Sequence, residues 1–114
     1  MQGIYFINER WQAGNLTKEE SIYLQKHALQ AYLKDNQINA VTLNPTQLNN
    51  FYTIPHALLH DLKQHSRIHL DCLILFSEDA IADFIYSYPA RWIRLKSYFD
   101  EVLFVEQALV RKAI

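Results

Sequence analysis

The chain has 114 residues and a formal net charge of −1, from 11 Lys and Arg against 12 Asp and Glu. This length fits a single domain and excludes a second independent core. The near-neutral balance disfavours autonomous DNA binding, which usually depends on a basic surface. Cys72 is the single cysteine, which excludes an internal disulfide. It lies in an apolar run, where we expect a buried thiol.

No targeting or membrane segment is recognisable. Residues 1–6 lack the basic region and long apolar stretch of a secretory signal. No stretch reaches the roughly 20 apolar residues of a membrane-spanning helix. We therefore expect a cytoplasmic protein that has no membrane partner.

The first half of the chain alternates an apolar run, a helical pattern and a second apolar run. Residues 3–8 predict a strand, which a loop over 9–15 follows. Thr17 and Glu20 have the spacing of a capping box and open a helix that should end near residue 36. The second strand is expected over 38–43. The apolar stripe of the predicted helix consists of Ile22, Gln25, Leu29 and Leu33, with Ala28 and Tyr32 beside it.

The second half repeats this alternation after a polar stretch over 44–50. Thr53 and Pro55 favour a helix over 54–65, because threonine can cap a helix and proline is tolerated in its first turn. Residues 68–76 are almost continuously apolar, as in a central strand covered on both faces. Pro89 should divide a helical region into helices over 79–87 and 89–98, or kink a single helix at that point. Ser77, Glu78 and Asp79 are expected to cap the first of them, and residues 101–105 form the last strand.

Three segments of the chain carry motifs in a recognisable order. The first strand contains Ile4-Tyr5 and is followed by Ser21-Ile22-Tyr23-Leu24-Gln25. The second helix opens with Ile54-Pro55-His56-Ala57-Leu58-Leu59. The third strand contains Leu73-Ile74-Leu75-Phe76 and leads into Asp79-Ala80-Ile81-Ala82-Asp83. In order and spacing over residues 3–107, this pattern resembles the catalytic domain of serine recombinases, the resolvases and invertases. That family has Tyr-x-Arg-x-Ser, Ser-(x)3-Gln, Arg-Pro-x-x-x-Leu and Asp-Arg-Leu-x-Arg at these places.

The departures from the family pattern imply a lost activity. The nucleophilic serine corresponds to Glu9, four arginines correspond to Ile7, Ile54, Ala80 and Asp83, and only the aspartate is kept, as Asp79. Transesterification at a phosphodiester needs a hydroxyl nucleophile and guanidinium groups that stabilise the phosphate charge. We therefore expect no enzymatic activity. The family's long dimerisation helix and DNA-reading domain have no counterpart in the remaining residues, 108–114.

The pattern and the resemblance together predict a three-layer, flavodoxin-like and resolvase-like α/β domain over residues 1–107. Its sheet should be mostly parallel, with four or five strands and helices on both faces. Residues 108–114 form a C-terminal tail that either begins a truncated helix or frays.

An aromatic segment suggests a protein-interaction surface. Aromatic and arginine side chains crowd the region around Pro89, and both types are enriched at interfaces. Part of this cluster must be core. The candidate interaction patch consists of Phe84, Tyr86, Tyr88, Arg91, Trp92 and Arg94. Arg91, Arg94 and Lys96 also suit an ordinary solvated helix face. The favoured function is a non-catalytic interaction or regulatory module, which either self-associates or binds a DNA-processing or regulatory protein.

A small-ligand site or an enzyme that uses acidic residues at the strand ends is the alternative. Ligands of open α/β sheets bind at the carboxyl ends of the strands, and Glu9, Ser77 and Asp79 are the candidates there. The other polar residues expected at these ends are Arg10, Asn44, Glu78 and Glu106. No glycine-rich phosphate loop is present. His56 and His60 have a spacing that zinc sites use, but no third ligand is evident, so we expect neither a metal nor a cofactor.

Overall fold

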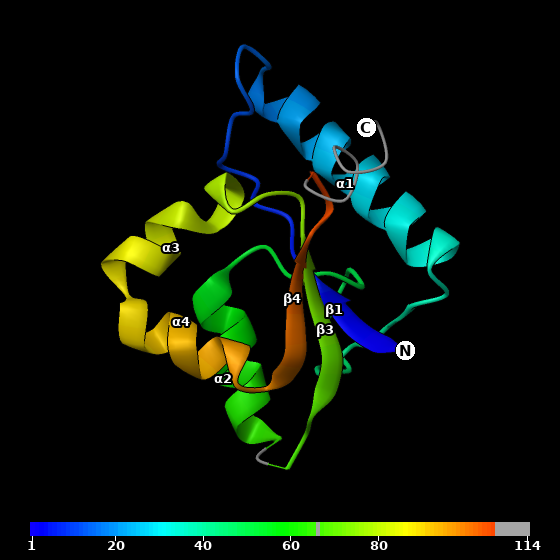
Figure 1. Cartoon of the computed structure of the whole chain (residues 1–114), viewed down its shortest axis with the longest axis vertical. Helices are drawn as coiled ribbons and strands as arrows, with labels where there is room; N and C mark the ends of the chain where they lie inside the picture. Colours follow the sequence, from blue (N-terminus) through cyan, green and yellow to red (C-terminus); the bar gives the residue numbers. More distant parts are fainter. Residues whose placement is uncertain (66, 107–114) are drawn as a thin grey trace.

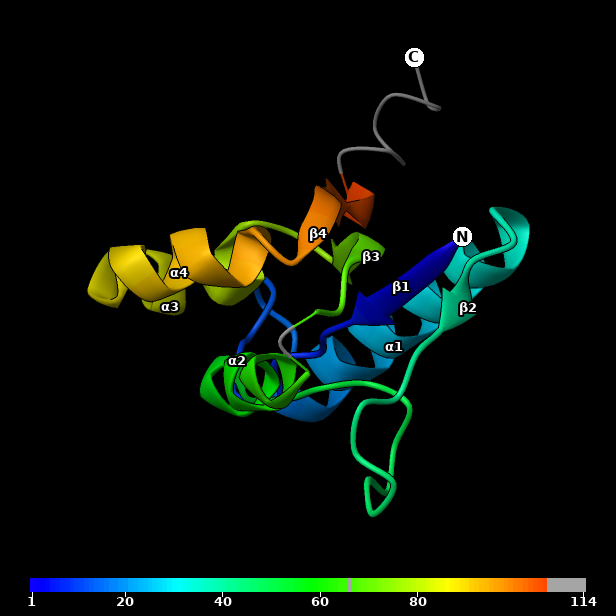
Figure 2. The same ribbon diagram turned by 90° about the horizontal axis from the view of Figure 1, so that it is seen from below.

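A parallel four-stranded sheet forms the centre of the structure, a computed structural model that describes residues 1–65 and 67–106. The strands are β1 (Gln2–Tyr5), β2 (Asn39–Ala40), β3 (Leu70–Leu75) and β4 (Phe99–Phe104). They lie in the order β2-β1-β3-β4, and all three strand pairs are parallel (Figures 1 and 2). The mostly parallel sheet expected from the sequence is confirmed. The expected domain end at 107 and the tail over 108–114 lie outside the described residues.

The helices cover both faces of this sheet. They are α1 (Lys18–Asp35), α2 (Pro55–Gln64), the 3-10 helix η1 (Asp79–Ile81), α3 (Ala82–Ser87) and α4 (Pro89–Lys96). Helix α1 lies on one side of the sheet, and α2, α3 and α4 lie on the other (Figure 1). None of the helices within residues 1–65 and 67–106 is long and apolar enough to span a bilayer.

Each face of the sheet has its own apolar core. Side chains of β3 alternate between them, so Cys72 and Ile74 pack toward α1, while Leu73 and Leu75 pack toward α2, α3 and α4. The α1 side includes Leu29 and Leu33 of that helix. The opposite side includes Leu58, Leu62, Phe84, Trp92 and Leu95. Strand β3 is therefore covered on both faces, as its continuous apolar sequence predicted.

Helix α1 begins and ends where the sequence predicted. The Thr17 hydroxyl accepts a hydrogen bond from the Glu20 amide at 3.1 Å, and the Glu20 carboxylate accepts one from the Thr17 amide at 3.0 Å. These bonds complete the capping box, and Asn36 is the C-cap. The expected stripe faces the sheet, since Gln25, Leu29 and Leu33 are buried.

The second strand is much shorter than the expected 38–43, and this prediction was wrong in length. Tyr52 occupies the edge of β1 beyond Gly3, because its amide donates to the Tyr5 carbonyl at 3.1 Å and its carbonyl accepts from the Ile7 amide at 2.9 Å. Phe6 pairs with Tyr52 as an isolated parallel bridge. A longer β2 would need the same edge. The chain leaves it after Val41 and turns toward the α2 side, where Leu43 is buried.

Other element ends differ in smaller ways. Thr53 does not cap α2: Ile54 is the N-cap residue and has no side-chain capping bond, while Pro55 takes the first helical position. The first strand ends at Tyr5, and β4 begins earlier than expected, at Phe99. The division of the helical region at Pro89 is confirmed, since α3 ends at Ser87 and α4 starts at Pro89.

The order of connections places a topological switch point between β1 and β3. From β1 the chain crosses by α1 to β2, and from β2 it crosses by α2 to β3 on the opposite side of β1. The two connections leave on opposite faces (Figure 1), which opens a crevice at the carboxyl ends of β1 and β3. Open α/β sheets bind their ligands at this place.

Candidate functional site

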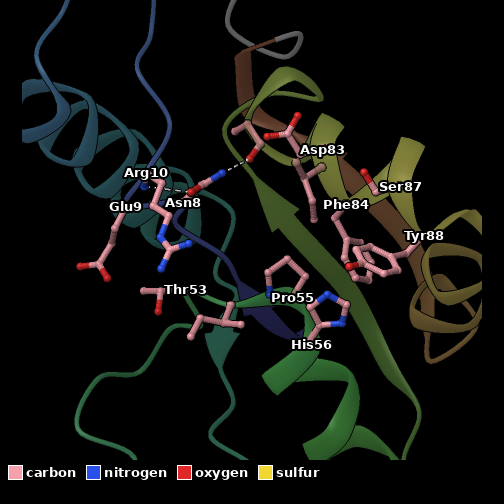
Figure 3. A pocket seen from close by; sticks show the side chains of 13 residues that line it. Asn8, Glu9, Arg10, Thr53, Pro55, His56, Asp83, Phe84, Ser87 and Tyr88 are labelled. Atoms are coloured by element: carbon pink, nitrogen blue, oxygen red, sulfur yellow. Dashed lines mark hydrogen bonds between the residues drawn. The ribbon is translucent and has the colours of Figure 1, made fainter.

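A pocket of about 420 Å³ lies at the switch point; we call it the switch-point pocket. Three segments form its walls: the loop after β1, the start of α2, and the region from η1 to the end of α3 (Figure 3). The residues that line it are Asn8, Glu9, Arg10, Thr53, Ile54, Pro55, His56, Ala80, Ile81, Asp83, Phe84, Ser87 and Tyr88.

The positions singled out by the family resemblance converge on this pocket. Glu9, Ile54, Ala80 and Asp83 come from three distant parts of the sequence and all line it. Ile7 does not, because its side chain is fully buried in the core beneath α1. Asp79 is also outside the lining. Four of the six positions therefore share one site.

A buried glutamine fixes the loop after β1. Gln25 of α1 is fully buried, and its Oε1 accepts from the Asn8 amide at 2.9 Å. Its Nε2 donates to the carbonyls of Asn8 at 2.9 Å and of Ser21 at 3.1 Å. The Ser21 hydroxyl, also buried, accepts from the Ala13 amide at 2.9 Å. Both polar side chains of the Ser-(x)3-Gln segment thus hold the loop that carries the site.

Asn8 extends this network across the pocket. Its Nδ2 donates to the Ala80 carbonyl at 2.8 Å, and its Oδ1 accepts from the Arg10 amide at 2.9 Å (Figure 3). The first bond ties the loop to η1, and the second sets the backbone of Arg10. A single hydrogen bond, from Asn8 to Ala80, therefore joins two of the walls.

The grouping of Glu9, Ser77 and Asp79 as one ligand site was wrong. Ser77 is buried, and its hydroxyl accepts from the Ala80 amide at 3.3 Å. Asp79 accepts from the Trp11 indole Nε1 at 2.8 Å. Both side chains stabilise local structure around η1, and only Glu9 of the three lines the switch-point pocket.

An aromatic wall closes the side of the pocket formed by α2 and α3. The His56 ring packs edge-on against Phe84, with centroids 5.1 Å apart, and against Tyr88, at 4.7 Å. Phe84 and Tyr88 lie 5.9 Å apart. Arg91 of α4 donates from Nη1 to His56 Nδ1 at 2.9 Å, and its guanidinium lies over the Tyr88 ring at 5.2 Å. These contacts hold the wall in place.

The predicted interaction patch is divided between core and surface. Phe84 is 6% exposed and Trp92 is 9% exposed, and both pack in the core beneath α3 and α4. Placing these two in a surface patch was wrong, because they supply the apolar face of two short helices. Tyr86, Tyr88, Arg91 and Arg94 are at the surface. Ile93 of α4, which is not part of the predicted patch, is 65% exposed.

The pocket has a mixed charge. Arg10 contributes a guanidinium, and Glu9 and Asp83 contribute carboxylates. Among residues 1–65 and 67–106, no group of three or more His, Cys, Asp or Glu is arranged to hold a metal ion. His56 is engaged with Arg91 in the aromatic wall, and His60 is exposed on α2.

The two groups with perturbed acidity lie away from the pocket. Burial, together with the nearby carboxylates of Glu101 and Asp71, raises the pKa of the Cys72 thiol to about 11. The thiol is therefore neutral and unreactive at neutral pH. Burial also raises the pKa of Tyr52, whose hydroxyl donates to Asp61 at 2.6 Å.

The sequence did not predict a site role for Asn8 or Gln25, although Gln25 belongs to the predicted stripe and to the Ser-(x)3-Gln segment. Asn8 follows a strand and gave no distinguishing signal. Gln25 did give one, because it is a polar residue in the apolar stripe of an amphipathic helix. A buried polar side chain must find hydrogen-bond partners, and the partners nearest to that stripe belong to the loop before the helix.

Comparisons with known proteins find no family model, no curated protein and no solved structure that matches the chain.

Proposed function

We propose that the chain is a non-catalytic, resolvase-like module that binds a protein partner. The partner is a second copy of the chain or a DNA-processing or regulatory protein. One observation carries the proposal: Glu9, Ile54, Ala80 and Asp83 line one pocket at the carboxyl ends of β1 and β3. These are the positions where the family resemblance implies the nucleophile and three arginines. The site keeps its place in the fold but has different chemistry.

The side chains in the pocket do not suit strand cleavage. Cleavage needs a hydroxyl activated by a base and several donors on the phosphate. Arg10 is the one guanidinium in the lining, and the carboxylates of Glu9 and Asp83 would repel a phosphodiester. The hydroxyls of Thr53 and Ser87 also line the pocket, but neither is hydrogen-bonded to a base within the described residues. Losing a single hydrogen-bond donor to the developing negative charge typically raises the activation free energy by about 3 kcal/mol, and several such donors are missing here.

The topology supports the resemblance at the level of the fold. The strand order β2-β1-β3-β4, with α1 on one face and α2, α3 and α4 on the other among the described residues, is compatible with the order 2-1-3-4-5 of flavodoxin-like domains. The net charge of −1 favours a protein partner over autonomous DNA binding.

The outer surface of α3 and α4 is the proposed contact surface. Tyr86 is 76% exposed, Ile93 is 65% exposed and Tyr88 is 44% exposed, with the guanidinium groups of Arg91 and Arg94 among them. Tyrosine and arginine are the residue types that dominate binding energy at protein interfaces. We call these five residues the α3–α4 face.

Site-specific photo-crosslinking in the native host tests this proposal. A photoreactive phenylalanine analogue replaces Tyr86 on the α3–α4 face in one variant and Tyr23 of α1 in the matched control. Tyr23 is similarly exposed, at 65%, but lies on the opposite side of the sheet. We expect a discrete crosslinked protein, identified by mass spectrometry, from position 86 and none from position 23. Crosslinks at neither position, or equally at both, would contradict a specific contact through this face.

A cleavage assay tests the non-catalytic part. The purified chain should form no covalent adduct with supercoiled or nicked DNA, because neither hydroxyl in the pocket lining, Thr53 or Ser87, is hydrogen-bonded to a base among the described residues. A DNA-linked adduct that persists under denaturing conditions would overturn the proposal.

A further inference from the structure

We propose that the switch-point pocket binds a small aromatic zwitterion, namely a free α-amino acid with an aromatic side chain. This inference does not rest on the contact proposed for the α3–α4 face, although Tyr88 belongs to both surfaces and Arg91 of that face supports the aromatic wall of the pocket. It depends on the volume of the pocket, its aromatic wall and its three charges.

The pocket has the size of a small-molecule site. Its volume of about 420 Å³ is within the range of roughly 300–1,000 Å³ typical of ligand pockets. It also lies at the switch point of the sheet, where ligands of this architecture bind. An aromatic amino acid is small enough to be held within this volume.

The aromatic wall suits a ring in the ligand. His56, Phe84 and Tyr88 contact one another at centroid distances of 4.7 to 5.9 Å and face the pocket together with Pro55 (Figure 3). Aromatic rings gain from offset or edge-to-face packing at such distances. Since Arg91 holds His56 and Tyr88 from outside, the wall is already formed before a ligand arrives.

The guanidinium of Arg10 suits a carboxylate. Figure 3 shows it projecting from the loop after β1 into the space above Thr53 and Pro55. The Arg10 side chain forms no ion pair and no hydrogen bond within residues 1–65 and 67–106. A guanidinium binds a carboxylate through two parallel hydrogen bonds. Its backbone is already positioned by Asn8.

The two carboxylates exclude a simple anion and favour a ligand that also carries a positive charge. Glu9 and Asp83 line the same pocket as Arg10, and Figure 3 shows their carboxylates well apart, so a ligand with negative charge alone would leave both of them uncompensated. An ammonium group on the ligand would instead be attracted to them. Ring, carboxylate and ammonium together describe an aromatic α-amino acid.

Amide chemical-shift titrations of the ¹⁵N-labelled chain test the inference. L-phenylalanine is the probe, and three analogues each lack one feature: L-alanine lacks the ring, phenethylamine the carboxylate and 3-phenylpropionate the ammonium. We expect L-phenylalanine to shift the amides of Asn8, Thr53 and Ser87 and to saturate with a Kd of about 1 mM or lower. Each analogue should bind at least about tenfold more weakly.

Two variants complete the test. Arg10→Gln should weaken the binding of L-phenylalanine at least about tenfold. Arg94→Gln removes an exposed arginine outside the pocket and should not change the affinity. Arg10 is itself exposed, so its replacement should leave the spectrum of a folded chain. The inference is overturned if L-phenylalanine shifts no pocket amide at about 20 mM. It is also overturned if any analogue binds as tightly, or if Arg10→Gln binds as the unmodified chain does.

Discussion

Replacing Gln25 by leucine should destabilise the whole domain and loosen the loop after β1. The Gln25 side chain is fully buried and makes three hydrogen bonds, two of them to the backbone of Asn8 and one to the Ser21 carbonyl. Leucine has a similar volume but can neither donate nor accept. The substitution therefore removes hydrogen bonds without opening a large cavity.

The expected loss follows from counting these bonds. A typical intramolecular hydrogen bond contributes a net of about 1 kcal/mol, and each buried partner left unsatisfied adds a penalty of about 1–3 kcal/mol. Asn8 is only half-buried, so water can reach part of its backbone and reduce that penalty. We expect the free energy of unfolding of Gln25→Leu to fall by about 3 kcal/mol. For a domain of this size that corresponds to a decrease in Tm of about 12 °C.

Urea unfolding and hydrogen exchange measure this effect. The control is Gln30→Leu on the same helix, since Gln30 is exposed and makes one long bond of 3.4 Å to the Tyr5 hydroxyl. It should cost less than about 0.5 kcal/mol. In Gln25→Leu, the amides of Asn8 and Arg10 should also lose protection before the rest of the sheet. If both variants unfold at the same urea concentration, the assigned role of Gln25 is refuted.

Three further predictions concern the core. Gly3→Ala should cost about 1–3 kcal/mol by urea unfolding, because its Cβ would lie 2.8 Å from Cys72 Sγ and 3.0 Å from the Cys72 carbonyl. If adding Cys72→Ala fully restores the stability lost in Gly3→Ala, the predicted clash with the Cys72 carbonyl is contradicted. Tyr52→Phe should lower the free energy of unfolding by about 1–2 kcal/mol, because it removes the hydrogen bond to Asp61, while the control Tyr98→Phe should change it little. Equal effects of the two substitutions would contradict a contribution from this hydrogen bond. The folded thiol of Cys72 keeps its proton to about pH 11, whereas the unfolded thiol loses it near pH 9. Stability should therefore fall by up to about 1.4 kcal/mol per pH unit in this interval. Cys72→Ala should show a shallower alkaline decline, and an unchanged slope would exclude this contribution.

Helix α1 was predictable because all its determinants are local. The Thr17–Glu20 capping box fixes the start within four residues. The spacing of Leu29 and Leu33 sets the buried face independently of what it packs against. The third strand was predictable for a related reason, since the run of buried apolar residues over 72–76 is covered on both faces and needs no alternation.

The length of the second strand was not predictable from local pattern. Residues 41–43 are as apolar as the residues that do pair with β1, but Tyr52 takes the next place on that edge. Competition between two segments for one row of backbone donors and acceptors is a property of the tertiary structure. The polar residues 44–50, which precede Tyr52, gave no sign that the chain returns to the sheet at Tyr52.

The site was predictable in position but only partly in composition. Glu9, Ile54, Ala80 and Asp83 were expected together from the order of the motifs, and they line one pocket. The aromatic wall was not expected, because His56 of α2 meets Tyr88 and Arg91 only through the packing of α2 against α3 and α4. Phe84 and Trp92 were misplaced for the same reason: composition shows that aromatics crowd a segment, but not which of them face inward.

The residues that shape the pocket are separate from those that give it charge, and this separation leads to a final prediction. Gln25 and Asn8 fix the walls by satisfying backbone groups, which the fold needs whatever binds there. Glu9 is exposed and only lines the pocket. Glu9→Gln should therefore leave the free energy of unfolding within about 0.5 kcal/mol of that of the unmodified chain. It should weaken the binding of L-phenylalanine several-fold, because it removes one carboxylate from the pocket. Gln25→Leu should reduce both stability and affinity. If Glu9→Gln destabilises the chain as much as Gln25→Leu does, the residues that shape this pocket and those that give it charge are not separable.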